Sequence, residues 1–274
     1  MQNGNIWELP FGDTGEMELQ SEWGSLTVLP VEPGKSPRLE LSPGSAENVA
    51  VHVEKVGEVV RVALDPHHNW FGGGECRAVL YVPSNVRASV ETNAGSISVR
   101  GLEGCELGIK ASAGKIDLVD VYGLLHLGAD AGSINGRGLG GYLDVEAHAG
   151  SIRLEILDLQ PGEHRVRASM GSVRLELARG MDVSIETHTA LGSVRNSFPT
   201  HQSAPARLVL TTEMGSIRVD EALAVRAVQR PEAAERPGQV SREDPELDRI
   251  LKMVEAGELS ARDADELLRA MGRV

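Results

Sequence analysis

Residues 90–99 read VETNAGSISV, and later segments of the chain repeat their pattern. The later copies are IKASAGKIDL (109–118), LGADAGSING (127–136), VEAHAGSIRL (145–154), VRASMGSVRL (166–175), THTALGSVRN (187–196) and LTTEMGSIRV (210–219). Each copy has a glycine in its sixth place, and successive glycines are 19, 18, 18, 21, 21 and 23 residues apart. Internal repeats of this length indicate a repeat architecture with one structural unit per copy.

Equivalent places in the copies carry similar side chains. Two residues after each glycine the side chain is β-branched: Ile97, Ile116, Ile134, Ile152, Val173, Val194 and Ile217. Three residues before each glycine it is small: Thr92, Ala111, Ala129, Ala147, Ala168, Thr189 and Thr212. Polar residues fall between these places, which is strand alternation on both sides of a corner. The pattern predicts that Ile134 and Ile152 are stacked and fully buried.

These features predict an all-β fold, a right-handed parallel β-solenoid whose coils stack one upon another along the chain. Antiparallel hairpins would also alternate, but one strand-forming copy every 18–23 residues fits a solenoid better. The hand follows from the strong preference of parallel crossovers for right-handed connections. The 31 glycines suit tight corners, and an aromatic content of 3% suits a thin core of Val, Ile and Leu. The coil before Gly192 is expected to bulge, because polar Thr187 stands where other copies are mostly apolar.

An eighth copy, MELQSEWGSLTV (17–28), lies upstream with Gly24 in the motif place. Between it and the main array, VAVHVEKVGEVVRVAL (49–64) predicts a hairpin that turns at Gly57. We therefore expect residues 1–85 to form an N-terminal β region that starts the solenoid and caps its open edge. Residues 86–222 would form the solenoid, 223–244 a flexible, proline-containing linker, and 245–274 a short α-helical hairpin.

The expected hairpin has one narrow apolar stripe on each helix. Asp244 and Pro245 are typical of a helix start, and Gly257 separates the two helices. The stripes consist of Leu247, Ile250, Leu251 and Val254, and of Ala264, Leu267, Leu268 and Met271. Helices this short need tertiary packing, so another apolar surface must cover them. The hairpin is either a lid on its own chain or an association device, and we favour self-association.

Charge and cysteine content limit the partners. The net charge of −13 disfavours nucleic acid, whose binding depends on Lys and Arg, and it disfavours anionic membrane surfaces. No apolar run is long enough for a membrane span. Two cysteines without C-x-x-C spacing, and an N-terminus without a basic start or an apolar run, lead us to expect a cytoplasmic protein.

The run from VLYVPSNVRASVETNAGSI to LTTEMGSIRV resembles the bacterial putative-adhesin β-solenoid family of unknown function, whose members repeat a Gly-Asp/Ser-Ile/Val corner. The segment DRILKMVEAGELSARDADELLRAM resembles the SHOCT-like short domain that accompanies such solenoids. The resemblance implies a β-solenoid of a kind often linked to bacterial envelope stress and a helical piece that mediates association. It implies no catalytic residue and no cofactor.

The densest cluster of reactive side chains is DPHHNWFGGGEC (65–76). His67, His68 and Cys76 could ligate zinc, together with Asp65 and Glu75, but adjacent histidines and the lack of a second paired cluster argue against a metal site. Trp70 and Phe71 are either an exposed anchor for a partner or a cover for the first coil.

A polar column lies two residues before the glycines: Asn93, Ser112, Asp130, His148, Ser169, Ala190 and Glu213. Asp130 and His148, one coil apart, could hold a cation or act in hydrolysis, but the side chain differs in almost every coil, so a solvated face is the better interpretation.

The leading hypothesis is therefore a non-enzymatic scaffold or regulatory protein-interaction protein that self-associates through Leu247, Ile250, Leu251, Val254, Leu267 and Leu268. The alternative is a carbohydrate- or surface-binding module of the adhesin type. A glycan-active solenoid enzyme is a weaker alternative, because the polar column does not gather the several acids that such enzymes use.

Overall fold

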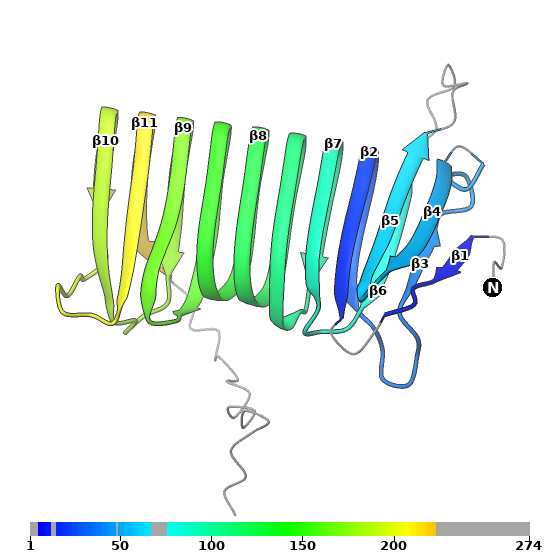
Figure 1. The fold of residues 1–274 in the computed structure, drawn as a ribbon. Helices are drawn as coiled ribbons and strands as arrows, with labels where there is room; N and C mark the ends of the chain where they lie inside the picture. Colours follow the sequence, from blue (N-terminus) through cyan, green and yellow to red (C-terminus); the bar gives the residue numbers. More distant parts are fainter. Residues whose placement is uncertain (1–4, 12–14, 48, 67–75, 223–274) are drawn as a thin grey trace, which may run out of the picture. The chain divides into compact units, whose positions relative to one another are not determined.

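The computed structural model describes residues 5–11, 15–47, 49–66 and 76–222. The chain divides into two units, Met1–Arg226 and Ala227–Val274, and the described residues all belong to the first. They form strands and connecting turns, with no helix among them (Figure 1). The strands are β1 (Ile6–Glu8), β2 (Glu16–Pro30), β3 (Arg38–Leu41), β4 (Val49–Val56), β5 (Val59–Pro66), β6 (Arg77–Val82), β7 (Arg87–Arg100), β8 (Glu103–Leu159), β9 (Gly162–Leu177), β10 (Val183–Asn196) and β11 (Ala206–Glu221).

The strands join one large, mostly parallel sheet. Its order is β1-β3-β6-β2-β7-β8-β9-β11-β10, with β5 also paired to β2 and β4 paired to β5. Pairing is parallel from β2 to β10 and antiparallel where β1 meets β3, β3 meets β6 and β4 meets β5. The long strand β8 contains three of the repeat copies, those of Gly114, Gly132 and Gly150. The sequence prediction of an all-β fold is confirmed.

The motif glycines form one column across the sheet. Gly95 pairs with Gly114, and Gly150 pairs with Gly171. Inside β8, a Cβ added to Gly132 would lie 1.7 Å from the carbonyl oxygen of Gly114. Successive backbones therefore approach so closely at this point that only glycine fits. The repeat alignment made from the sequence is thus the pairing register of the structure.

The burial pattern changes phase at each glycine. In the copy of Gly150, Val145 and Ala147 are buried before the glycine, whereas Ile152 and Leu154 are buried after it. The buried residues stand at odd distances before the glycine and at even distances after it. In a straight strand these two sets would point to opposite faces, so both reach one core only because the strand turns a corner at the glycine. Ile134 and Ile152 are both 0% exposed, in neighbouring copies, as predicted.

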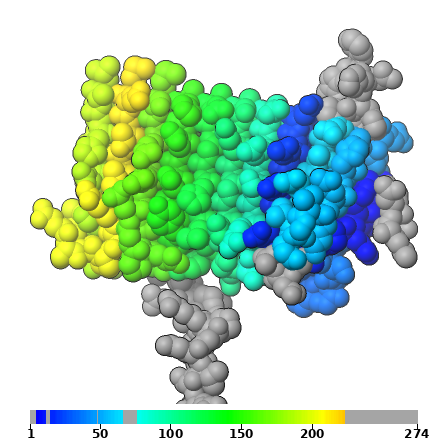
Figure 2. All heavy atoms as spheres, viewed as in Figure 1, coloured from blue at the N-terminus to red at the C-terminus, as the bar shows by residue number. Residues whose placement is uncertain are grey.

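The N-terminal copy lies directly against the main array (Figure 2). Gly24 pairs with Gly95, and the two halves of β2 are covered by β5 and β6 on the other side. The predicted hairpin is present, since β4 and β5 pair antiparallel from Val56–Val59 outward and Gly57 has a φ of 65°. Leu26, the inward residue of β2 after its glycine, is only 4% exposed as a result.

The far end of the array does not follow sequence order. Strand β11 lies between β9 and β10, so Gly171 pairs with Gly215 and Gly215 pairs with Gly192 (Figure 1). The chain passes over one position after β9, forms β10, and returns to fill the gap with β11. Our expectation that the copies stack along the chain is therefore wrong for the last two. The repeat columns of β10 and β11 are alike, so either strand satisfies the register next to β9.

The expected bulge before Gly192 is also absent. Thr187 pairs with Leu210, and between Val183 and Asn196 the register skips only Ala190 with Glu213. The pairings of β7 with β8 and of β8 with β9 skip the same place of the repeat, two residues before the glycine. Because β10 is the last strand, Thr187 is only partly buried there. A hydroxyl at a half-solvated position costs little, so the strand has no need to turn it outward.

Candidate functional site: a polar groove across the repeats

The predicted interaction residues lie outside the described part of the chain. Trp70 and Phe71 fall in residues 67–75, and Leu247, Ile250, Leu251, Val254, Leu267 and Leu268 fall in residues 223–274. His67, His68 and Glu75 of the candidate metal cluster lie outside it as well. Across the described residues, no group of three or more His, Cys, Asp and Glu side chains is placed to hold a metal ion. No helix in these ranges is long and apolar enough to cross a membrane.

Both ends of the reactive cluster, Asp65 and Cys76, are described. Asp65 Oδ2 lies 3.8 Å from His52 Nε2 on the surface, whereas Cys76 has a structural role. Its carbonyl oxygen accepts a hydrogen bond from the Ser25 N–H at 2.7 Å, beside the corner at Gly24. Burial raises the pKa of the Cys76 thiol, and burial raises the pKa of the Cys105 thiol to about 11. Both thiols are therefore protonated at neutral pH and are poor nucleophiles and metal ligands.

The polar column contains Asp130 and His148, the pair that the sequence pattern places one coil apart. Asp130 Oδ1 and His148 Nδ1 lie 3.4 Å apart on adjacent copies. A second pair lies on the same face, with His126 Nδ1 3.9 Å from Asp144 Oδ2. All four side chains are substantially exposed, so each pair is worth little as a stabilising ion pair. The sequence predicted the first pair, whereas the second was missed because it lies in the column six residues before the glycines.

These pairs border a shallow groove of about 400 Å³ on the outward face of β7 and β8. Gly108 and Gly128 lie in the groove and leave it open, since they present no side chain. Glu91, Lys110 and Glu146 complete its charged lining. The groove can bind a hydroxyl-rich ligand, because carboxylates accept and Lys or His donates hydrogen bonds to hydroxyl groups.

Aromatic and apolar side chains occupy the same face beside the groove. The Tyr142 ring lies between His126 and His164, with ring centroids 5.8 and 5.3 Å away. Leu124 and Tyr122 are exposed, and the Tyr122 hydroxyl lies 3.5 Å from Asp158 Oδ2. An exposed tyrosine offers an apolar ring and a polar tip, which suits a ligand that is apolar on one side and hydroxylated on the other.

A second outward face carries ordered rows of charge. In four adjacent strands, the residue three places after the glycine is an arginine. These arginines lie side by side in the order Arg153, Arg174, Arg218 and Arg195. Two places further along in β8, β9 and β11, Glu155, Glu176 and Asp220 form an acidic row. Arg218 donates from Nε to Asp220 Oδ2 at 2.5 Å, which links the rows.

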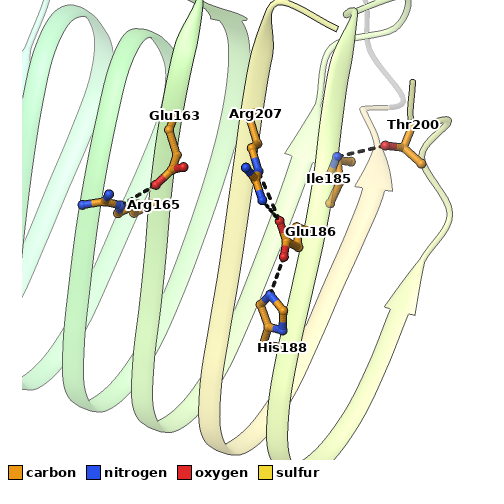
Figure 3. A network of polar contacts seen from close by, with 7 residues as sticks. All are labelled: Glu163, Arg165, Ile185, Glu186, His188, Thr200 and Arg207. Carbon is orange, nitrogen blue, oxygen red and sulfur yellow. Dashed lines mark hydrogen bonds and ion pairs between the residues drawn. The ribbon is translucent and has the colours of Figure 1, made fainter. Parts of the chain in front are cut away.

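A polar cluster lies on the outward face of the last two strands of the array, β11 and β10 (Figure 3). The Glu186 carboxylate on β10 accepts hydrogen bonds from the Arg207 guanidinium of β11, and it accepts one from His188 Nε2 at 2.9 Å. The Arg207 hydrogen bond, followed by that of His188, lowers the pKa of the Glu186 carboxyl. Glu186 is therefore a fixed negative charge next to the end of the sheet.

Comparison with known proteins assigns the C-terminal segment. Residues 245–273 match the SHOCT-like domain, in agreement with the sequence resemblance. No curated protein matches the chain. Among solved structures, a putative cell adhesion protein from Clostridium sporogenes is similar at 10% identity and a TM-score of 0.38, covering 79% of this chain and 98% of that one. A putative adhesin from Bacteroides fragilis is similar at 10% identity and a TM-score of 0.32, covering 78% and 95%.

Proposed function

We propose that this protein is a non-enzymatic, self-associating scaffold. In this proposal the parallel sheet closes into a right-handed β-solenoid that displays binding faces, and the segment 245–274 is a helical hairpin that joins copies. The in-register glycine column supports the solenoid, since each copy repeats the same corner against its neighbour. Several identical chains held together would present their faces multivalently and raise avidity without new contacts.

The observation that carries self-association is the charge on the outward face that holds the arginine and acidic rows. Arg153, Arg174 and Arg218 stand in a row, with Glu155 and Glu176 beside them. Such a surface does not match the apolar stripes of the SHOCT-like segment, which the sequence predicts at Leu247–Val254 and Leu267–Met271. A second copy of the segment offers matching stripes and can bury them symmetrically, as most soluble homo-oligomers do.

The test is the mass of the full chain in solution, measured by light scattering. Leu251→Asp should lower the oligomeric state and leave the β-sheet circular dichroism unchanged, because it places a charge on the stripe that a second copy would bury in this proposal. Arg249→Asp, which introduces the same side chain off the stripe, is the control and should keep the wild-type mass. An unchanged mass for Leu251→Asp would make the hairpin a lid on its own chain.

The groove on β7 and β8 favours a second candidate function, a glycan-binding module. Its Gly128 has ordinary backbone geometry, and an added Cβ would come no closer than 3.9 Å to its neighbours. Gly128→Gln should therefore fill the groove without strain and abolish binding to any glycan that the wild type retains on a glycan array. Gly44→Gln is a control at a glycine with nothing within 4 Å of an added Cβ. A wild type that retains no glycan would eliminate this candidate.

A further inference from the structure

The two ends of the parallel array are covered differently. At one end, β5 and β6 pair with β2, and Leu26 is 4% exposed. At the other end, β11 is the one described strand that pairs with β10, and the equivalent inward residue, Val194, is 42% exposed. The start of β10 is covered by the loop of residues 197–205, since the Ile185 N–H donates to Thr200 Oγ1 at 2.9 Å and the His201 N–H donates to the Val183 carbonyl at 3.1 Å (Figure 3). From Glu186 to Asn196, no described segment pairs with the outer edge of β10, whereas the earlier strands of the array have a neighbour on both sides.

From Glu186 to Asn196, strand β10 lacks the devices by which proteins protect an exposed sheet edge. Such edges are usually short, bulged, interrupted by proline, or lined with lysine or inward-pointing charge. β10 is 14 residues long and keeps its register with β11 throughout. Its sequence VSIETHTALGSVRN contains neither proline nor lysine, and its inward residues Thr187, Thr189 and Val194 are uncharged. From Glu186 to Asn196, the outward backbone groups of this edge have no strand or loop partner among the described residues, so another strand can pair with them.

An apolar ridge leads to the same edge. One residue before the glycine, the middle copies carry alanine: Ala94, Ala113, Ala131 and Ala149. The last three strands carry Met170, Met214 and Leu191 instead, which pair side by side and are 51, 48 and 67% exposed. Large apolar side chains in the open are typical of interaction surfaces, and these three lie in the copies nearest the uncovered end.

We propose that the open edge of β10 is a homodimer interface, in which the β10 strands of two copies pair antiparallel about a two-fold axis at the corner of Gly192. Inward residues must face inward residues across the junction, because strand faces alternate. This condition places Thr189 opposite Val194 of the second copy, and Thr187 opposite Asn196 of the second copy. The cores of the two copies then become continuous through the junction.

The same register is complementary elsewhere. Leu191 falls beside the two-fold axis, so the apolar ridge of one copy continues into that of the other. Arg195 of the second copy lies opposite His188 and diagonal to Glu186, within reach of that fixed carboxylate. Head-to-tail stacking is not available to this edge, since the opposite end is already occupied by β5 and β6. The interface is closed and self-complementary, as a two-fold contact must be.

The register is tested by cysteine pairing. Thr189→Cys and Val194→Cys are made separately in the full chain carrying Leu251→Asp, so that the C-terminal stripe does not contribute. Directly opposite residues in antiparallel strands have Cα atoms about 4.5–5.5 Å apart, which suits a disulfide. The native Cys76 and Cys105 are buried and do not compete. Mild oxidation of the mixed variants should give a covalent dimer, whereas each variant alone should give none.

Two results would overturn the proposal. If the mixture gives no covalent dimer, β10 does not pair with a second copy. Either another occupant, such as the chain's own residues 223–274, then covers β10, or the edge stays unpaired. Covalent dimer in either variant alone means a different register. Failure of the hairpin proposal would show separately, as an unchanged mass for Leu251→Asp, and would leave the cysteine result intact. Circular dichroism of each variant confirms that the sheet is retained.

Discussion

Gly150→Ala tests the close approach of neighbouring copies. The Gly150 φ is 149°, and an added Cβ would lie 1.6 Å from the carbonyl oxygen of Gly132. Contacts below 3.0 Å essentially never occur for a real Cβ, so the two strands would have to part by at least 3.0 − 1.6 = 1.4 Å. That separation breaks backbone hydrogen bonds on both sides of the corner, each worth about 1 kcal/mol. The unfavourable φ adds about 1–3 kcal/mol.

The expected loss is about 3–6 kcal/mol in the free energy of unfolding, measured by urea denaturation followed by circular dichroism. Gly162→Ala is the matched control, because its φ is 133° but nothing lies within 4 Å of an added Cβ. It should lose only the conformational part, about 1–3 kcal/mol. Losses that agree within about 0.5 kcal/mol for the two variants would refute the stacked glycine column.

Three further predictions concern buried side chains. Ile152→Ala should cost about 2–5 kcal/mol of stability in urea, because it opens a cavity in a fully buried column; a neutral effect would contradict the repeat alignment. His164 is buried and neutral, with Nδ1 accepting from the Leu143 N–H and Nε2 donating to the Gln160 carbonyl, and burial lowers its pKa below 6.5. As pH falls below about 6.5, the unfolded chain takes up a proton at this imidazole and the folded chain does not. The free energy of unfolding should therefore drop by up to about 1.4 kcal/mol per pH unit. Denaturation at a series of pH values should show this slope in the wild type and not in His164→Gln. Cys105, with its raised pKa, should resist a thiol reagent at pH 8 in the native state and react after denaturation, as mass spectrometry would show.

The repeat made most of the fold predictable from the sequence. Glycine, small and β-branched columns are repeated in every copy, and backbone contact at the glycines enforces the register that they indicate. The hairpin at Gly57 followed from the same kind of local signal. These features could be predicted because each arises from residues that are close in sequence or occupy the same column.

The order of the last two strands could not be predicted in this way. β10 and β11 share the columns of the repeat, so local pattern does not distinguish which of them lies against β9. A signal did exist in the polar inward residue Thr187, because the other copies carry Val, Ile or Leu at this place and a hydroxyl suits a terminal strand better than an internal one. The groove was missed for a related reason, since Gly108 and Gly128 act through the side chains that they lack.

The two proposed interfaces make one joint claim, that copies of this chain meet both at the hairpin and at β10. Light scattering on four full-length samples tests it most directly: wild type, Leu251→Asp, Val194→Lys, and the double variant. The account predicts a wild-type mass above that of a dimer, a dimer for each single variant, and a 29.3 kDa monomer for the double variant. A wild type that already measures 29.3 kDa would contradict it.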